Sequence, residues 1–435
     1  MTNHQPTSLE TIVALCKRRG FVYPSAEIYG GINGMYDFGH LGVLMKENIR
    51  HAWLKSLENN NGEIVRLEGA LIGPEAMWKA SGHIEGFHDP LVDCKKCKHR
   101  FRADDINLEK PCTHCGNKDW TEVRNFNMMF KTNLGALEGT GSIAYLRPET
   151  AQAIYVNFKN VMTTSRTKIP FGIAQIGKAF RNEITPKQFL FRMREFEQME
   201  MQWFCKGDLA PQELSNWVAK RLAFYESIGI NMNRIKARQQ TVDERAHYST
   251  NCFDVEYEFP FGWKELEGIA HRGNFDLTQH TNHSGKELSV FDESTKESYI
   301  PHVVECSVGV DRLFLTLLFN AYHEDIVEGE TRVVLKLHPS IAPLKIAFLP
   351  LSKQLNEPTE KLYQEFKQAG ISVEFDTSGS IGKRYRRQDE IGTPYCVTYD
   401  FESQEDGAVT IRHRDTTLQE RIKIDQLTAY FKGKF

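Results

Sequence analysis

Residues 171–205 place the strongest constraint on the fold, because they predict two long antiparallel strands joined by a polar loop at 182–188. A two-residue period gives the second strand one polar face and one face rich in methionine. The polar face holds Phe196, Gln198, Glu200 and Gln202. On the first strand, small residues share a face with Arg181. A polar row on an interior strand needs partners, so the pair predicts a ligand site on one face of an antiparallel sheet.

Residues 300–322 predict a further strand that runs directly into a helix. Glu305, Ser307 and Gly309 share one face of this strand, and Arg312 falls in the first turn of the helix. The apolar run 313–319 continues that helix. The segment therefore combines an acidic strand face with a basic helix start.

The loop and strand ends at 180–196 concentrate arginines, glutamates and phenylalanines. Guanidinium groups bind phosphate through paired hydrogen bonds, an aromatic ring can stack on a purine, and a carboxylate can accept a hydrogen bond from an exocyclic amine. An exposed hairpin held by salt bridges would explain the same composition. The acidic and basic features at 300–322 favour the nucleotide interpretation.

Four of the nine cysteines form two C-x-x-C pairs separated by 14 residues. These residues are Cys94, Cys97, Cys112 and Cys115. The spacing is close to that of a zinc ribbon, and four thiolates make a closed tetrahedral site without room for substrate. We expect a structural zinc ion in a polar insertion at about residues 86–145. The alternative is a cluster without metal, with His99 and His114 as possible substitute ligands.

Beyond Pro343 the pattern alternates between strands and helices, which predicts a separate α/β domain at 341–435. We expect residues 1–340 to form the larger domain, which carries the candidate ligand site, with a second insertion at 206–300. A basic cluster in the C-terminal domain includes Arg384, Arg386 and Arg387, although acidic and basic residues balance across that domain. A solvated helix face would also explain the cluster.

With 435 residues, 40% hydrophobic and 26% charged, the chain has enough apolar surface for two or three packed domains. Its apolar runs are far shorter than the roughly 18 residues that span a bilayer, so we expect no membrane segment. The polar residues 1–6 lack the apolar core of a signal peptide, which predicts a cytoplasmic protein. Because the net charge is −3, any nucleic acid must bind through local basic patches.

Several of these motifs resemble those of class II aminoacyl-tRNA synthetases. The residues Phe180, Arg181 and Glu183, followed by Arg192 and Phe196, look like motif 2 of that class. Residues 309–312 look like its motif 3. Longer strings are similar to the homodimeric glycyl-tRNA synthetase family, and they lie at 29–31, 146–152, 194–200 and 381–387. The resemblance extends over about residues 8–430.

The resemblance implies an α+β chain with a class II catalytic domain built on an antiparallel sheet, a zinc-bearing insertion and a C-terminal anticodon-binding domain. It implies a homodimer that ligates glycine to tRNA(Gly) in two steps. ATP and glycine form glycyl-adenylate with the help of Mg²⁺, and the glycyl group then moves to the 3′ end of the tRNA. No protein nucleophile is required, because glycine's own carboxylate attacks the α-phosphate.

The resemblance also assigns roles to individual residues, with Arg181 and Arg312 as catalytic residues. The implied ATP-binding residues are Arg181, Asn182, Glu183, Phe191, Arg192, Phe196, Glu265, Leu266, Gly309 and Arg312. The implied glycine-binding residues are Arg102, Glu149, Phe196, Glu200, Glu305 and Ser307. Similarity to an anticodon-binding domain favours the cluster of Arg384, Arg386 and Arg387 as tRNA contacts.

Two positions depart from the family pattern, since His40 and Cys306 stand where the family usually has proline. We expect His40 to alter the turn before the motif 1 helix and Cys306 to pack in the core. Two other functions compete with the ligase. A noncatalytic synthetase-like protein would lose the phosphate-binding arginines, and a class II ligase for serine, threonine, proline or histidine would lack the pocket of three glutamates. The residues present disfavour both.

Overall fold

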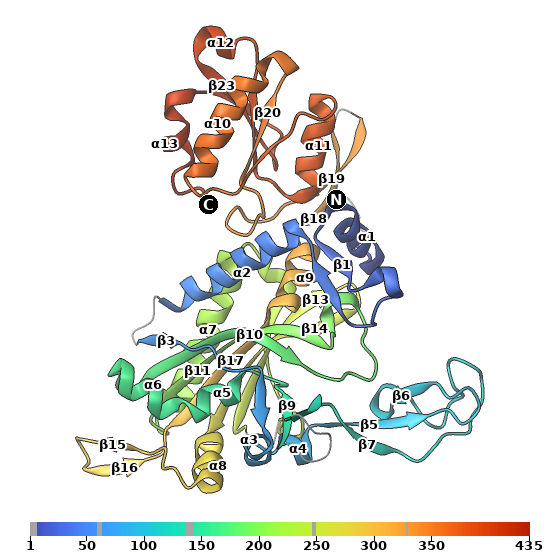
Figure 1. Cartoon of the computed structure of the whole chain (residues 1–435), viewed down its shortest axis with the longest axis vertical. Coiled ribbons are helices and arrows are strands. Elements are labelled where there is room, and N and C mark those ends of the chain that lie inside the picture. Colours follow the sequence, from blue (N-terminus) through green and yellow to red (C-terminus); the bar gives the residue numbers. More distant parts are fainter. Residues whose placement is uncertain (1–6, 59–62, 136–141, 246–248, 328) are drawn as a thin grey trace.

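The computed structural model describes residues 7–58, 63–135, 142–245, 249–327 and 329–435. The polar residues 1–6, used above to predict the location of the protein, lie outside these ranges. Figure 1 shows a large body around a central sheet, with a C-terminal α/β unit above it and a slender extension to one side. In the described parts of the chain, no helix is long and apolar enough to cross a membrane.

A seven-stranded sheet, antiparallel except at the β3 edge, forms the centre of the body. In spatial order its strands are β12 (Ile235–Gln239), β13 (Asn251–Phe259), β14 (Gly262–Gly273), β17 (His302–Gly309), β11 (Glu195–Cys205), β10 (Phe171–Phe180) and β3 (Ile64–Arg66). The predicted strand pair is confirmed, with Gln175 opposite Glu200. On the other side of β11, Glu200 lies opposite Ser307 and Gln202 opposite Glu305. The register therefore places the polar face of β11 beside the acidic face of β17.

Residues 206–300, for which we expected an insertion, contribute three strands to this sheet. Their apolar side chains, including Val255, Tyr257 and Ile269, lie in the main core. The hairpin of β15 (Val290–Asp292) and β16 (Glu297–Tyr299) forms a separate small sheet. Most of the segment therefore belongs to the central architecture.

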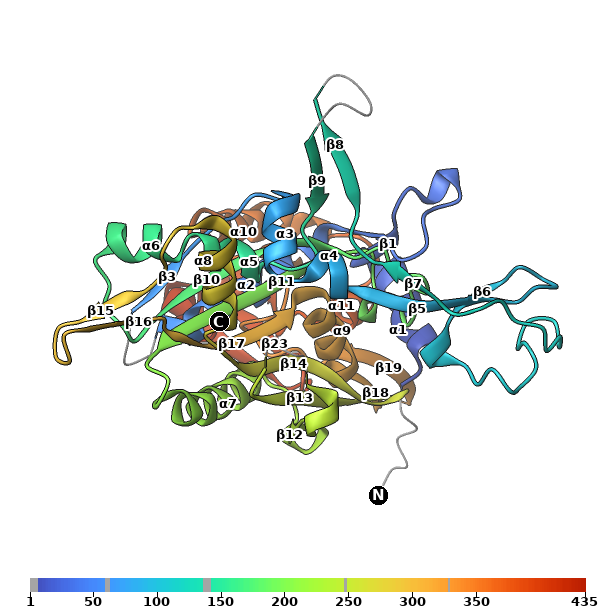
Figure 2. The same ribbon diagram turned by 90° about the horizontal axis from the view of Figure 1, so that it is seen from below.

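Helices pack on both faces of the sheet (Figure 2). The helices of the body are α1 (Leu9–Arg19), α2 (His40–Glu58), α3 (Glu75–Ala80), α4 (His83–Gly86), α5 (Ala151–Val156), α6 (Phe158–Ser165), α7 (Ala210–Ser227), α8 (Phe275–Ser284) and α9 (Val310–Ala321). Helices α2, α7 and α9 bury one face, together with Met199, Met201 and Cys306. Cys306 is 1% exposed, which confirms its predicted core position. On the opposite face, α5, α6 and α8 cover one end and leave the polar row accessible at the other.

A glycine-rich segment between two short paired strands precedes the longest helix of the body. These strands are β1 (Val22–Pro24) and β2 (Tyr36–Phe38). Helix α2 begins regularly at His40, where the backbone N–H of Val43 donates to the carbonyl of Gly39. The side chain of His40 is exposed, so its replacement of proline leaves the helix start intact.

The slender extension and its base form two small sheets (Figure 2). The extension consists of β6 (Arg100–Arg102), β5 (His88–Asp93) and β7 (Arg124–Asn127). The sheet at its base consists of β4 (Ile72–Pro74), β9 (Ser142–Leu146) and β8 (Lys131–Leu134), and the β8–β9 hairpin projects from there as a separate arm (Figure 2). Because β4 precedes the predicted insertion at 86–145 and pairs with β9 inside it, the insertion is tied into the body at its C-terminal end.

The C-terminal unit is a mixed five-stranded sheet with its own core, as the alternating pattern predicted. Its strands are β21 (Val373–Phe375), β20 (Ile346–Pro350), β22 (Tyr395–Tyr399), β23 (Ala408–His413) and β24 (Gln419–Lys423). Its helices are α10 (Asn356–Gln368), α11 (Ile381–Ile391), α12 (Ser403–Asp406) and α13 (Leu427–Phe431). The hairpin of β18 (Tyr322–Val327) and β19 (Glu330–Leu335) leads into it. Arg19 of α1 contacts Glu390 of α11 at 2.5 Å, which joins unit and body.

Candidate active site

A cavity of about 540 Å³ lies over one face of β11, β13, β14 and β17. The predicted site residues that line it are Arg102, Glu149, Arg181, Glu183, Phe191, Arg192, Phe196, Glu200, Glu265, Leu266, Gly309, Glu305, Ser307 and Arg312. Asn182 is the exception: it does not line the cavity, and its backbone N–H donates to the carbonyl of Met128. Residues far apart in the sequence thus meet around one space.

Arginines and aromatic rings occupy one part of the cavity wall. The guanidinium of Arg181 lies 5.2 Å from the ring of Phe87 and 5.3 Å from that of Phe196. Arg312, in the first turn of α9, stacks on Phe191 at 4.3 Å and donates to the backbone carbonyl of Glu265 at 2.8 Å. These contacts hold two cations at fixed positions, an arrangement suited to a polyanionic ligand.

Several cavity residues carry buried polar atoms without a hydrogen-bond partner in the described structure. They are Asp89 Oδ2, Arg102 Nε, Glu183 Oε2, Arg192 Nη1 and Gln198 Oε1. Burial raises the pKa of Glu183, although Arg192 and Arg181 act against that rise. Because buried polar groups nearly always find partners, these atoms indicate a bound molecule that supplies both acceptors and donors.

Three carboxylates, those of Glu149, Glu200 and Glu305, converge in another part of the cavity. Glu200 accepts hydrogen bonds from the hydroxyls of Thr150 and Ser307. Glu305 accepts from the side-chain amide of Gln202 at 2.8 Å. So many acidic groups around one space are suited to a cation.

The three carboxylates differ in electrostatics. Burial, with Glu305 and Glu149 nearby, raises the pKa of Glu200 to about 8. Burial also raises the pKa of Glu305. Burial would raise that of Glu149 too, but His83 and Arg272 beside it hold its pKa below the ordinary value. The site therefore holds a protonatable carboxyl next to an ionised one at neutral pH.

Sequence reasoning did not assign a role to Arg272, which the structure places behind the acidic group. Its guanidinium is 2% exposed, donates to both oxygens of Asp276 at 2.8 and 2.9 Å, and approaches Glu305 at 3.3 Å. His83, also unassigned, lies 3.4 Å from Glu149. Arg272 lies near the end of β14 and Asp276 in the first turn of α8, so no local periodicity in the sequence signals their contact.

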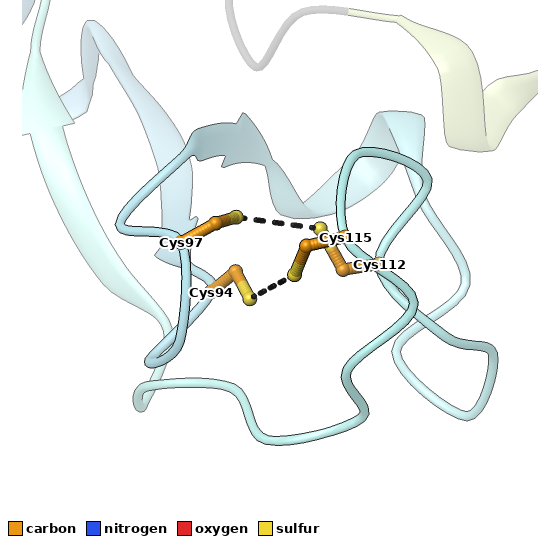
Figure 3. Close-up of side chains that lie close together, drawn as sticks. All are labelled: Cys94, Cys97, Cys112 and Cys115. Carbon is orange, nitrogen blue, oxygen red and sulfur yellow. Dashed lines mark hydrogen bonds between the residues drawn. The ribbon is translucent and has the colours of Figure 1, made fainter.

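The four clustered cysteines come together at the slender extension (Figure 3). All four sulfurs lie within 4.8 Å of one another, with Cys94 3.6 Å from Cys115 and Cys97 3.8 Å from Cys112. Tetrahedral Zn–S bonds of about 2.3 Å require sulfur separations of roughly 3.8 Å. The geometry and the soft donor set fit a zinc ion.

The structure contradicts the assignment of Arg384 to tRNA. Arg384 is 4% exposed, and its guanidinium donates to the carbonyls of Pro350 and Asp376. The helical period turns it towards the sheet of the C-terminal unit, so its charge is unavailable to RNA. Arg387 donates to the carboxylate of Asp376, and Arg386 donates to the carbonyl of Val327. Their assignment stays a prediction.

Two family models match the chain. The tRNA synthetase class II core domain (G, H, P, S and T) matches residues 138–321, and the anticodon binding domain matches residues 345–434. The first range holds β11, β13, β14, β17 and the start of α9, which line the cavity. Fold and site together define a class II aminoacyl-tRNA synthetase.

Proteins called glycine–tRNA ligase from Caldanaerobacter subterraneus subsp. tengcongensis and Treponema denticola are each 50% identical to this chain, over 98–99% of it and 98% of their own lengths. This chain belongs to the glycine–tRNA ligase family. The relative of the same name from Geobacillus thermodenitrificans is 47% identical over 98% of this chain and 97% of its own.

Proposed function

We propose that the chain ligates glycine to tRNA(Gly) by forming glycyl-adenylate in this cavity. The observation that carries the proposal is one space with guanidinium groups on one wall and three carboxylates on another. ATP and glycine have the complementary charges, since phosphates match the arginines and an ammonium group matches the acids. Membership of the glycine–tRNA ligase family supports the same reaction.

In the first step, a carboxylate oxygen of glycine attacks the α-phosphate in line and pyrophosphate leaves. We assign Arg181 to the α-phosphate, Arg192 to the outer phosphates and Arg312 to a further phosphate. Phe196 would stack on the adenine ring, and the unpartnered Oε2 of Glu183 would accept from the adenine amino group. Fixed charges that match the developing charge stabilise the transition state. In the second step, a hydroxyl of the terminal ribose of tRNA attacks the glycyl carbonyl and AMP leaves.

ATP use in this family involves Mg²⁺, which prefers oxygen ligands. The carboxylate of Glu265 is exposed in the cavity wall, 3.8 Å from Arg312, and is an acidic group that would hold such an ion. The ion would neutralise phosphate charge. The protein's own contribution is to orient the nucleotide between Arg312 and the aromatic rings.

For glycine, we assign Glu149, Glu200 and Glu305 to the ammonium group and Ser307 to the neighbourhood of the α-carbon. We assign Arg102, which pairs with Asp89 at 3.1 Å, to the entrance of the site. Glycine offers no side chain to hold, so its ammonium is the main handle and larger amino acids are excluded by bulk. A pocket that rejects by bulk does not need a separate editing site.

The direct test is pyrophosphate exchange with each of the twenty amino acids, followed by aminoacylation of tRNA(Gly). We expect exchange with glycine alone and transfer to tRNA(Gly). Exchange with no amino acid would favour the noncatalytic synthetase-like alternative. Exchange with serine, threonine, proline or histidine would assign the chain to another ligase specificity.

The raised pKa of Glu200 predicts that glycine binds more tightly as pH rises. Near pH 7 Glu200 is largely protonated in the free protein, and the glycine ammonium stabilises its ionised form, so binding releases a proton. We expect the KM for glycine to fall by up to about tenfold per pH unit from about pH 6 to about pH 8, then level off. Glu200→Gln should abolish this dependence. Exchange kinetics across pH, with ATP saturating, would measure it.

We propose that the cysteine cluster holds one structural zinc ion. Cys94, Cys97, Cys112 and Cys115 would supply all four ligands, which leaves no open position for substrate. The ion would stabilise the short strands β5, β6 and β7, which have little apolar core of their own. Cys94→Ser tests this assignment, because it should lower the zinc content of the protein.

With Arg384 excluded, we propose that tRNA contacts a hollow over β23 and β24, on the same face of the C-terminal sheet as α11. The hollow has a volume of about 510 Å³ and is lined by Leu351, Asp400, Phe401, Glu402, Thr410, Gln419, Glu420 and Arg421. Phe401 is 50% exposed, although it is a large apolar side chain. An exposed ring beside carboxylates and a guanidinium is suited to stacking and edge contacts with unpaired bases.

Phe401→Ala should raise the KM for tRNA about tenfold, because stacking on one base contributes roughly 1–3 kcal/mol. Pyrophosphate exchange without tRNA should be unchanged. Phe291→Ala, which removes an equally exposed ring on β15, is the matched control. An unchanged tRNA KM in Phe401→Ala would exclude this hollow as the contact.

We propose that the chain acts as a homodimer, as the resemblance implied. The segment between β1 and β2 exposes Ile28 by 89% and Tyr29 by 87%, and exposed apolar clusters of this kind often mark protein interfaces. We expect light scattering to give twice the chain mass, and Ile28→Asp with Tyr29→Asp to shift it towards the monomer. A wild-type monomer at micromolar concentration would contradict the proposal.

A further inference from the structure

Lys46 is a buried cation in the middle of an apolar helix face. It lies on α2 in the same stripe as Met45, Ile49 and Trp53, and it is 4% exposed. Lysine is almost never fully buried without partners. Its ring contact with Phe38, at 4.1 Å, does not satisfy an ammonium group by itself. The buried ammonium group therefore needs further partners.

The ammonium of Lys46 bridges two buried carboxylates from different elements. Its Nζ lies 2.7 Å from Oδ1 of Asp311 on α9 and 3.0 Å from Oε2 of Glu197 on β11. Asp311 also accepts the backbone N–H of Glu197 through Oδ2 at 2.7 Å. One carboxylate thus clamps the start of α9 to β11, and Lys46 neutralises the junction together with Arg50, whose guanidinium donates to Oε2 of Glu197 at 2.7 Å.

The two carboxylates stand next in sequence to cavity residues. Asp311 directly precedes Arg312, and Glu197 directly follows Phe196. Without the ammonium, Asp311 would lose its ion pair with Lys46 and would lie beside the buried carboxylate of Glu197, which would keep only Arg50 as its cation. Repulsion would separate β11 from the start of α9. The distance between the ring of Phe196 and the guanidinium of Arg312 would then change.

We propose that Lys46 is a positioning residue that sets Arg312 and Phe196 at the spacing required by ATP. The inference rests on the proposed function, because it takes these two residues as nucleotide contacts. The carboxylates assigned to glycine have no contact with Lys46 in the described structure. The effect of losing Lys46 should therefore fall on ATP and not on glycine.

The test is pyrophosphate exchange with Lys46→Met, which keeps the length and apolar stem of the side chain but removes the charge. We expect the KM for ATP to rise at least about tenfold, since small displacements of binding groups have large effects. The KM for glycine should stay within about twofold. Lys55→Met, an exposed lysine on the same helix, is the matched control.

Lys46→Arg should restore most of the ATP affinity, because a guanidinium can also bridge two carboxylates. If Lys46→Met does not fold, Asp311→Asn removes one of the two charges and keeps an acceptor for Glu197, and it should also raise the KM for ATP. A folded Lys46→Met with the wild-type KM for ATP would overturn the proposal, as would equal losses for ATP and glycine. A wrong proposed function would give a different result from a wrong role for Lys46, because wild-type protein would then show no exchange with glycine.

Discussion

Arg181→Ala should lower the rate of glycine-dependent pyrophosphate exchange by about 10²–10³, the usual effect of removing one group that stabilises transition-state charge. The side chain extends from the end of β10 into the cavity, where rings of Phe87 and Phe196 flank it and its Nε donates to the carbonyl of Pro148 at 3.1 Å. The side chain is half-buried at the cavity wall and is not part of the hydrophobic core. The loss should therefore be catalytic and leave the fold intact.

Lys178→Ala is the matched control for this prediction. Lys178 lies on the same strand, and its ammonium pairs at 2.8 Å with the exposed Glu195 outside the cavity. Both variants should melt at nearly the wild-type temperature, and only Arg181→Ala should lose exchange. Wild-type exchange in folded Arg181→Ala would remove this residue from the reaction.

Cys94→Ser should release about one zinc ion per chain and unfold the slender extension, because losing one thiolate opens a closed four-sulfur site. The strands β5, β6 and β7 are short, and structural zinc contributes folding free energy directly in small domains of this kind. Elemental analysis would measure the metal, and limited proteolysis would locate new cleavage between residues 94 and 127.

Cys396→Ser is the control for zinc loss, since it removes a buried thiol from the C-terminal unit, far from the cluster. Its zinc content should equal that of the wild type. If Cys94→Ser loses exchange activity, we expect the cause to be displacement of Arg102. This residue lies on β6 and pairs with Asp89 of β5. Wild-type protein purified without chelator and found to contain no zinc would refute the metal assignment.

Local periodicity and spacing were sufficient to predict much of the fold and of the candidate site. Alternation along 195–205 predicted which residues of β11 face the cavity, because side chains in a strand point to opposite faces in turn. Two C-x-x-C pairs predicted the cysteine cluster, because each pair places two sulfurs on one turn. Resemblance in several ordered motifs then predicted the family.

Long-range packing decided what these local rules could not. The sequence shows Arg384 as one of several cations, but the helix packs that side chain under the sheet, where Pro350 and Asp376 bind it. In the same way, nothing adjacent to Lys46 in the sequence indicates its carboxylate partners. Asp311 and Glu197 are brought to it by the packing of α2 on α9 and β11.

Glu265 and Glu267 show most clearly what the sequence predicts and what only the tertiary structure decides. A regular two-residue period would place both on one face of β14, and sequence alone identified Glu265 as a candidate site residue only by resemblance. A β-bulge at Leu266 breaks the period, since Glu267 pairs with Val255 and Glu265 with the next residue of β13. Glu265 consequently lines the cavity, whereas Glu267 is fully buried on the other face and accepts a hydrogen bond from Arg221 of α7 at 2.7 Å. The sequence by itself, through the resemblance, determined only that Glu265 was a candidate site residue. Only the pairing of β14 with β13 decided which acid faces the cavity, because one extra residue in a ladder reverses every side chain beyond it.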